Sequence, residues 1–178
     1  MSEKILTFKC YLLTINMEED GISNVYIDKL MNKISRSFHG TFSIDNIPEI
    51  DNDVFSIIIN LSKHHEKGTH FIAIYSLKNK ILYFDSFGMP IELSLRNYLK
   101  NYKKQIISSM FWLQNIFSNH CGFFCISFIV CIENNLTFNN FLSIFSRKEL
   151  FLNDYICIET IKIVIKHMYL RTQMNLIC

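Results

Sequence analysis

The stretch CGFFCISFIVCIE, residues 121–133, is apolar at nearly every position. Such a run predicts a helix that is buried on most sides. Cys121 begins this helix, where unpaired backbone N–H groups and the helix dipole stabilise a thiolate. Gly122 beside it leaves room for a substrate. Cys121 is therefore a candidate nucleophile, whereas Cys125 and Cys131 lie deeper in the helix and are expected to be small core residues.

Gln114 lies seven positions before Cys121, in the segment Leu113-Gln114-Asn115. It follows Ile106 to Leu113, which we predict to be a strand, and one short loop separates it from the helix. A Gln side chain placed there can donate its N–H to an oxyanion, beside the backbone N–H of Cys121. Trp112 is the only Trp in the chain. We expect it to lie in the core or in a cleft wall.

Two apolar runs upstream, His70 to Leu77 and Lys80 to Asp85, predict a hairpin joined at Lys78-Asn79. With a two-residue turn, His70 lies on the same face as Asp85. The two residues are then diagonal neighbours about 7–8 Å apart at the backbone, a gap that an imidazole and a carboxylate can bridge. A three-residue turn would place them on opposite faces of the hairpin.

The order along the chain is therefore His70, Asp85, Gln114 and Cys121. A cysteine peptidase needs a general base, a group that orients it, an oxyanion donor and a thiolate. The four residues supply these parts in that order. Asp85 taken alone would be a turn residue, and its pairing with His70 is what favours a catalytic role.

Other histidines are weaker candidates for the base. His64 and His65 fall in a polar turn and are expected to be exposed. His120 is adjacent to Cys121, and neighbouring side chains at a helix start usually point apart. No neighbouring feature of the sequence supports His39 or His167 as the general base.

The remaining sequence predicts an α+β protein. The predicted elements are an edge strand within Ile5 to Ile15, a helix over 22–38 capped by Asn24 or Ser23, a polar loop over 40–53, a strand from Phe55 to Leu61, and helices over 90–102, 139–145 and 153–168. A chain of 178 residues, 49% hydrophobic, is long enough for one domain with a sizeable core. We expect a single domain over residues 1–178, with 1–20 as an N-terminal extension.

Charge and cysteine content exclude several classes of protein. The net charge of +2 does not predict nucleic-acid binding. The six cysteines are irregularly spaced and no secretory signal is present, which favours free thiols in a reducing, intracellular compartment. The chain has no pair of CxxC units, which argues against a structural zinc site. The longest apolar run, 121–132, is too short to span a bilayer.

The chain resembles the adenovirus-type cysteine protease (adenain) family, within the broader clan of Ulp/SENP proteases. The segments that carry the resemblance are 68–71 (GTHF), 83–88 (YFDSFG), 113–125 (LQ through CGFFC) and 38–42 (FHGTF) with Pro48 following. The spacing of seven from Gln114 to Cys121 favours the adenain branch over the SUMO-protease branch. Phe71 and Asp85 depart from the Trp and Glu that are frequent in adenovirus enzymes.

The resemblance implies a papain-like fold, in which a mixed sheet packs against the helix that bears the nucleophile. It further implies a monomeric enzyme of a virus, or of an element such as a Polinton or adintovirus, that cleaves capsid or core precursor proteins in the virion and the host nucleus. The chemistry needs no metal or cofactor. Activation by a short peptide and by DNA is implied as well, with Cys178 a weak candidate for a disulfide-linked peptide.

The predicted function is therefore a cysteine endopeptidase that uses His70, Asp85, Gln114 and Cys121. One alternative is an isopeptidase that removes a ubiquitin-like modifier. The other is an inactive protease fold that serves as a binding module. The presence of all four polar residues favours the enzyme.

Overall fold

The centre of the fold is a sheet whose inner strands are apolar on both faces. The structure is a computed structural model and describes residues 21–174. The strands, in spatial order, are β1 (Phe38–Ser43), β2 (Phe55–Asn60), β3 (Phe71–Ser76), β4 (Lys80–Phe84) and β5 (Gln105–Ser108). The two outer pairs are parallel and the two inner pairs antiparallel, so the sheet is mixed.

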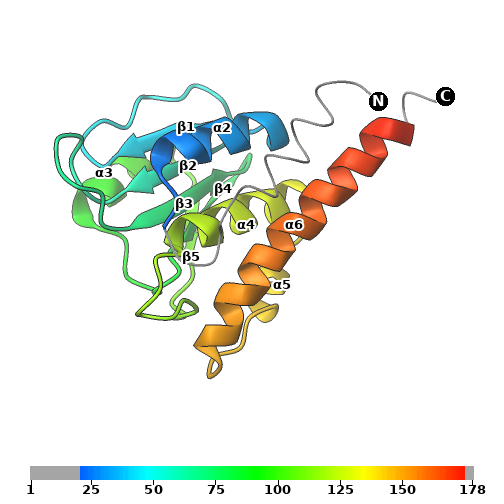
Figure 1. Cartoon of the computed structure of the whole chain (residues 1–178). Coiled ribbons are helices and arrows are strands. Elements are labelled where there is room, and N and C mark those ends of the chain that lie inside the picture. Colours follow the sequence, from blue (N-terminus) through cyan, green and yellow to red (C-terminus); the bar gives the residue numbers. More distant parts are fainter. Residues whose placement is uncertain (1–20, 175–178) are drawn as a thin grey trace.

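Helices cover both faces of this sheet (Figure 1). Alternate strand residues such as Ile58 and Phe84 face a layer of four helices: α2 (Asn24–Ile34), α4 (Cys121–Glu133), α5 (Phe138–Ser143) and α6 (Leu150–Met174). The residues between them, such as Ile57, face α3 (Leu93–Lys100). Because side chains alternate along a strand, burial on both faces requires a continuous apolar run.

Helix α4 has the predicted limits, and every residue from Cys121 to Ile132 is buried. It lies between β3 and α6, so none of its sides can be polar. Phe128 stacks on Phe84 with ring centroids 5.0 Å apart, and Phe141 packs edge-on against both. Each fully buried Phe contributes roughly 1.5–3 kcal/mol of transfer free energy.

Two local predictions are confirmed. In the hairpin the backbone N–H of Leu77 donates to the carbonyl of Lys80, and Ala73 pairs with Phe84, which is the register of a two-residue turn. Of the two candidate caps of α2, Ser23 is the N-cap, and its hydroxyl accepts a hydrogen bond from the amide of Tyr26.

Other predictions about element limits are wrong. Residues 38–43, predicted as the end of a helix and a polar loop, form β1, because they pair in parallel with β2. The predicted strand from Ile106 to Leu113 ends at Ser108. Helix α3 is shorter than predicted, with Leu93 exposed, and α6 begins earlier, at Leu150. The predicted edge strand in residues 5–15 lies outside the described residues.

No helix within residues 21–174 combines the length and the apolar character that crossing a membrane requires.

Candidate active site

Four polar side chains predicted from the sequence come from four different segments. His70 lies directly before β3 and Asp85 directly after β4. Because these strands are antiparallel neighbours, the two residues lie at the same end of the hairpin. Cys121 is the first residue of α4, and Gln114 lies in the loop between β5 and α4.

His70 and Asp85 form a direct hydrogen bond, with Nε2 of the imidazole 2.9 Å from Oδ1 of the carboxylate. Asp85 is fully buried, and the same oxygen accepts from the backbone N–H of Phe87 at 2.8 Å. The Phe87 ring lies against the imidazole at 4.8 Å between centroids. The carboxylate therefore fixes the ring so that Nε2 faces it and Nδ1 faces away.

The environment of His70 favours its protonated form. Burial lowers the pKa of His70, but hydrogen bonding to Asp85 and the neighbouring Cys121 sulfur together outweigh this and raise the pKa to about 9. Nδ1 is buried and has no fixed hydrogen-bond partner among the described residues, which leaves it available to Cys121. An imidazolium beside this sulfur stabilises a thiolate.

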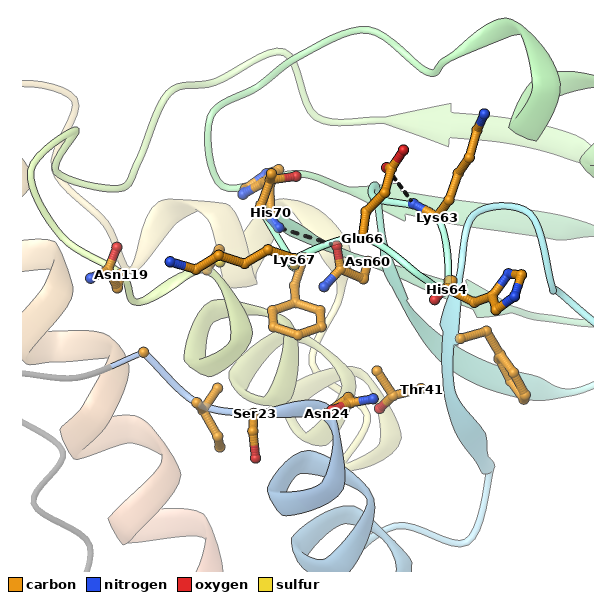
Figure 2. Close-up of a pocket in the computed structure, with 18 of the residues that line it drawn as sticks. Ser23, Asn24, Thr41, Asn60, Lys63, His64, Glu66, Lys67, His70 and Asn119 are labelled. Carbon is orange, nitrogen blue, oxygen red and sulfur yellow. Dashed lines mark hydrogen bonds between the residues drawn. The ribbon is translucent and has the colours of Figure 1, made fainter.

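Cys121, His70 and Gln114 all line one cavity of about 750 Å³. Figure 2 shows its walls: Ser23 and Asn24 at the start of α2 and Thr41 of β1 lie across the opening from Lys63, Glu66 and Lys67. Cys121 is only 9% exposed, and it lines this cavity.

Gln114 is held with its amide in one orientation. Nε2 donates to the carbonyl of Ser118 at 2.8 Å, and Oε1 accepts from the hydroxyl of Ser86 at 2.7 Å. A carbonyl can only accept, so the NH₂ group must face Ser118. The second hydrogen of that NH₂ group remains for a ligand in the cavity, which Gln114 lines.

The loop that carries Gln114 differs from the prediction. It runs over residues 109–120, because β5 ends early, and so Gln114 does not end a strand. Trp112 lies in this loop, half exposed, and does not line the cavity; its indole N–H donates to the carbonyl of Gln114 at 2.7 Å. Trp112 is therefore neither core nor cleft wall, and it fastens the loop instead.

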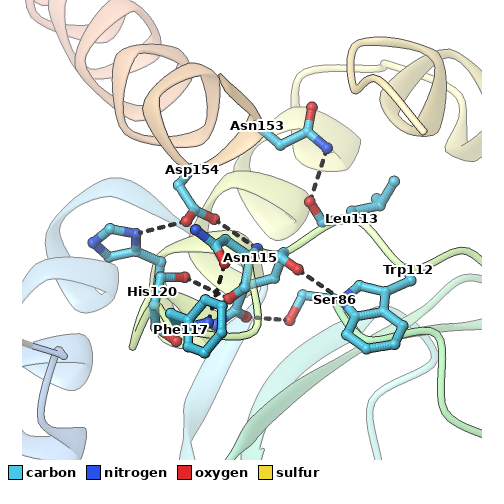
Figure 3. A network of polar contacts seen from close by, with 10 residues as sticks. Ser86, Trp112, Leu113, Asn115, Phe117, His120, Asn153 and Asp154 are labelled. Atoms are coloured by element: carbon cyan, nitrogen blue, oxygen red, sulfur yellow. Dashed lines mark hydrogen bonds and ion pairs between the residues drawn. The ribbon is translucent and has the colours of Figure 1, made fainter. Parts of the chain in front are cut away.

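The rival histidines have other bonding partners than Cys121. His120 lies outside the cavity lining, and Nδ1 of its ring is 3.6 Å from Asp154 of α6 (Figure 3). His64 is exposed and bonds Asp45 at 3.0 Å. His64, Asp45 and His65 form the one group within the described residues whose donor atoms could converge on a metal ion, and all three are exposed.

The other described cysteines are free and buried. Burial raises the pKa of the Cys125 and Cys157 thiols, and it raises that of Cys131 to about 11. These thiols are held neutral, as expected for core residues.

Sequence reasoning missed four residues that support this site. Ser86 and Phe87 follow Asp85, in a segment where the sequence assigned no supporting role to either residue. Asn153 and Asp154 bond the loop around Gln114 from α6. No spacing rule marks such contacts, because they join distant segments; Asn153 and Leu113, for example, are 40 residues apart.

Comparison with solved structures identifies a fold. The chain is similar to the crystal structure of ASFV pS273R protease, with a TM-score of 0.61 and 16% identity over 80% of this chain and 68% of that one. The selenomethionine form of the same protease matches with a TM-score of 0.58 and 14% identity, over 80% and 69%. No protein-family model and no curated protein sequence matches the chain.

The chain therefore has an α+β fold similar to that of this protease, with a mixed sheet packed against the helix that begins at Cys121, as the sequence predicts. At this level of identity the likeness shows the fold alone.

Proposed function

We propose that the protein is a cysteine endopeptidase. The observation that carries the proposal is the convergence of Cys121, His70 and Gln114 on one cavity, with Asp85 bonded to the far side of the imidazole. Each group is oriented for a different part of acyl transfer. The fold similarity to ASFV pS273R protease supports the same reaction class.

In the proposed reaction, the Cys121 thiolate attacks the peptide carbonyl and an S–C bond forms. Charge develops on the carbonyl oxygen, which the Gln114 amide and the backbone N–H of Cys121 stabilise. The backbone N–H groups of the first helical turn have no partner within the helix, so that of Cys121 is free for this purpose.

His70 then gives its Nδ1 proton to the leaving amine as the C–N bond breaks. The resulting thioester is hydrolysed by water, which loses a proton to Nδ1 as it attacks, and the thiolate leaves. Asp85 keeps Nε2 protonated and stabilises the imidazolium in both steps. No step needs a metal ion.

The resemblance of the sequence supports a narrower proposal. The substrates would be capsid or core precursor proteins cleaved during particle maturation, in the virion or the host nucleus. A short peptide and DNA would act as activators, with no membrane partner and a monomeric enzyme.

The test is turnover of a peptide library by the full chain, followed by mass spectrometry of the products. We expect Cys121→Ala to abolish turnover and to keep the fold, as judged by circular dichroism. Cys131→Ala, on the same helix but in the core, is the matched control and should retain turnover. Unchanged turnover in Cys121→Ala would overturn the proposal.

Two labelling experiments distinguish the alternative functions, an isopeptidase and an inactive binding module. Labelling of Cys121 by a ubiquitin-like vinyl sulfone, with no cleavage of any library peptide, would favour an isopeptidase. Slow and uniform alkylation of all accessible thiols by iodoacetamide, with or without added DNA, would favour an inactive binding module.

A further inference from the structure

Two residues near the start of helix α6 contact the backbone of the loop that carries Gln114, one on each side of Gln114. Nδ2 of Asn153 donates to the carbonyl of Leu113 at 2.8 Å. Oδ1 of Asp154 accepts from the backbone N–H of Asn115 at 3.3 Å. Two consecutive residues of one helix thus hold the backbone immediately before and immediately after Gln114 (Figure 3).

Asn153 is fully buried, and all its polar atoms are engaged. Besides Leu113, its Nδ2 donates to the carbonyl of Ser146 at 2.7 Å, and its Oδ1 accepts from the amide of Ser146 at 2.8 Å. A buried amide with every bond made has one orientation, and any other orientation leaves buried groups unpaired. Asn153 is therefore a rigid attachment point for the loop.

Asp154 reaches the other end of the same loop. Its Oδ2 lies 3.6 Å from Nδ1 of His120, and both side chains are largely buried. His120 immediately precedes Cys121, and its carbonyl accepts from the amide of Phe124 in the first turn of α4. One carboxylate thus contacts the loop just after Gln114 and just before Cys121.

These contacts lie outside the cavity, since neither Asn153 nor Asp154 lines it. The side-chain amide of Gln114 is held by Ser86 and Ser118, and the carbonyl of Ser86 also accepts from the backbone N–H groups of Leu113 and Gln114. Because Ser118 belongs to the same loop, its carbonyl can orient Gln114 only if the loop itself is fixed. The bonds from α6 add a restraint on both sides of Gln114, from a helix packed on α4.

We propose that Asn153 and Asp154 are positioning residues for oxyanion stabilisation, holding Gln114 and the amide of Cys121 in register with each other. The inference rests on the proposed peptidase function. Displacement of a catalytic group by about 1 Å can cost roughly a hundredfold in rate. Loss of the restraint should therefore lower turnover and leave the thiolate intact.

The test compares Asp154→Ala with Glu159→Ala, which removes another α6 carboxylate whose partner, Lys162, lies on the same helix. In Asp154→Ala we expect kcat to fall roughly 10–100-fold and KM to change less than about twofold. Amide hydrogen exchange over residues 115–120 should speed up roughly fivefold. Alkylation of Cys121 by iodoacetamide should keep its wild-type rate. Glu159→Ala should match the wild type throughout.

Asp154→Asn keeps an oxygen acceptor for Asn115 and should recover most of the kcat. Unchanged exchange in the loop, or unchanged kcat, in Asp154→Ala would overturn the inference. So would an equal loss of kcat and of alkylation rate, which would indicate general damage to the fold. Faster exchange in Asp154→Ala, beside a wild type that cleaves no peptide, would support the positioning of the loop and contradict the proposed function.

Discussion

Nε2 of His70 lies 2.9 Å from Oδ1 of Asp85, although the two residues are 15 positions apart. A two-residue turn at Lys78-Asn79 sets this distance, because the register it imposes brings the start of β3 beside the end of β4. A shift of one residue would turn one side chain to the opposite face of the sheet. The hairpin thus determines whether the imidazole has a carboxylate partner.

Asp85→Asn should shift the pH profile of kcat/KM. Asp85 helps raise the pKa of His70 to about 9, so the alkaline limb of the wild type should lie near that pH. A neutral Asn removes the negative charge, so the limb should move to lower pH. Turnover at the optimum should fall roughly 10²–10⁴-fold. Asp51→Asn, which changes an exposed aspartate outside the helices and strands, is the control. An alkaline limb that stays in place would show that Asp85 does not act on His70.

His70→Gln should change how stability depends on pH. The pKa of His70 is raised from about 6.5 to about 9 on folding, so its stabilising effect is fully present below about pH 6.5. The effect is lost as the pH rises through about 9. In urea unfolding under reducing conditions, the wild type should therefore have a larger free energy of unfolding than His70→Gln at pH 6. This difference should shrink by pH 9.5. Unfolding curves that differ by the same amount at both pH values would contradict the shift.

Gln114→Ala should lower kcat by roughly 10²–10³-fold, the cost of removing one oxyanion donor. Ser86→Ala leaves the donor in place and removes only the hydroxyl that holds Oε1, so its loss should be smaller. Single-turnover kinetics on a cleaved library peptide would measure both. An equal loss of kcat in Gln114→Ala and Ser86→Ala would mean that Gln114 supports the loop structure and does not donate to the oxyanion.

Gly122→Ala should destabilise the fold by about 1–3 kcal/mol, the range for overpacking a core. A Cβ at this position would overlap Cγ2 of Ile22 and would also lie 3.3 Å from Ile27 Cδ1 and 3.4 Å from Phe71 Cδ2. Adding Ile22→Ala should recover part of the loss, and a double-mutant cycle from urea unfolding gives the coupling. If the effects of Gly122→Ala and Ile22→Ala on the free energy of unfolding simply add, the new Cβ does not clash with Ile22 and the structure accommodates it in another way.

Local patterns predicted the elements that matter most to the site. The limits of α4, the turn at Lys78-Asn79 and the cap at Ser23 each depend on neighbouring residues, and the structure confirms all three. Strand β1 was missed because its residues become a strand only through parallel pairing with β2. Its Thr41 and Phe42 line the cavity, and no local signal indicated this.

The sequence by itself determined a buried helix that begins at a cysteine, and a hairpin that places a histidine beside an aspartate. Both follow from interactions over a few residues, which composition and periodicity record. Only the tertiary structure decided that Gln114 lies in a twelve-residue loop, that His120 turns toward Asp154, and that α6 holds this loop. These contacts join distant segments through single hydrogen bonds, which leave no periodic trace in the sequence because they depend on how whole elements pack.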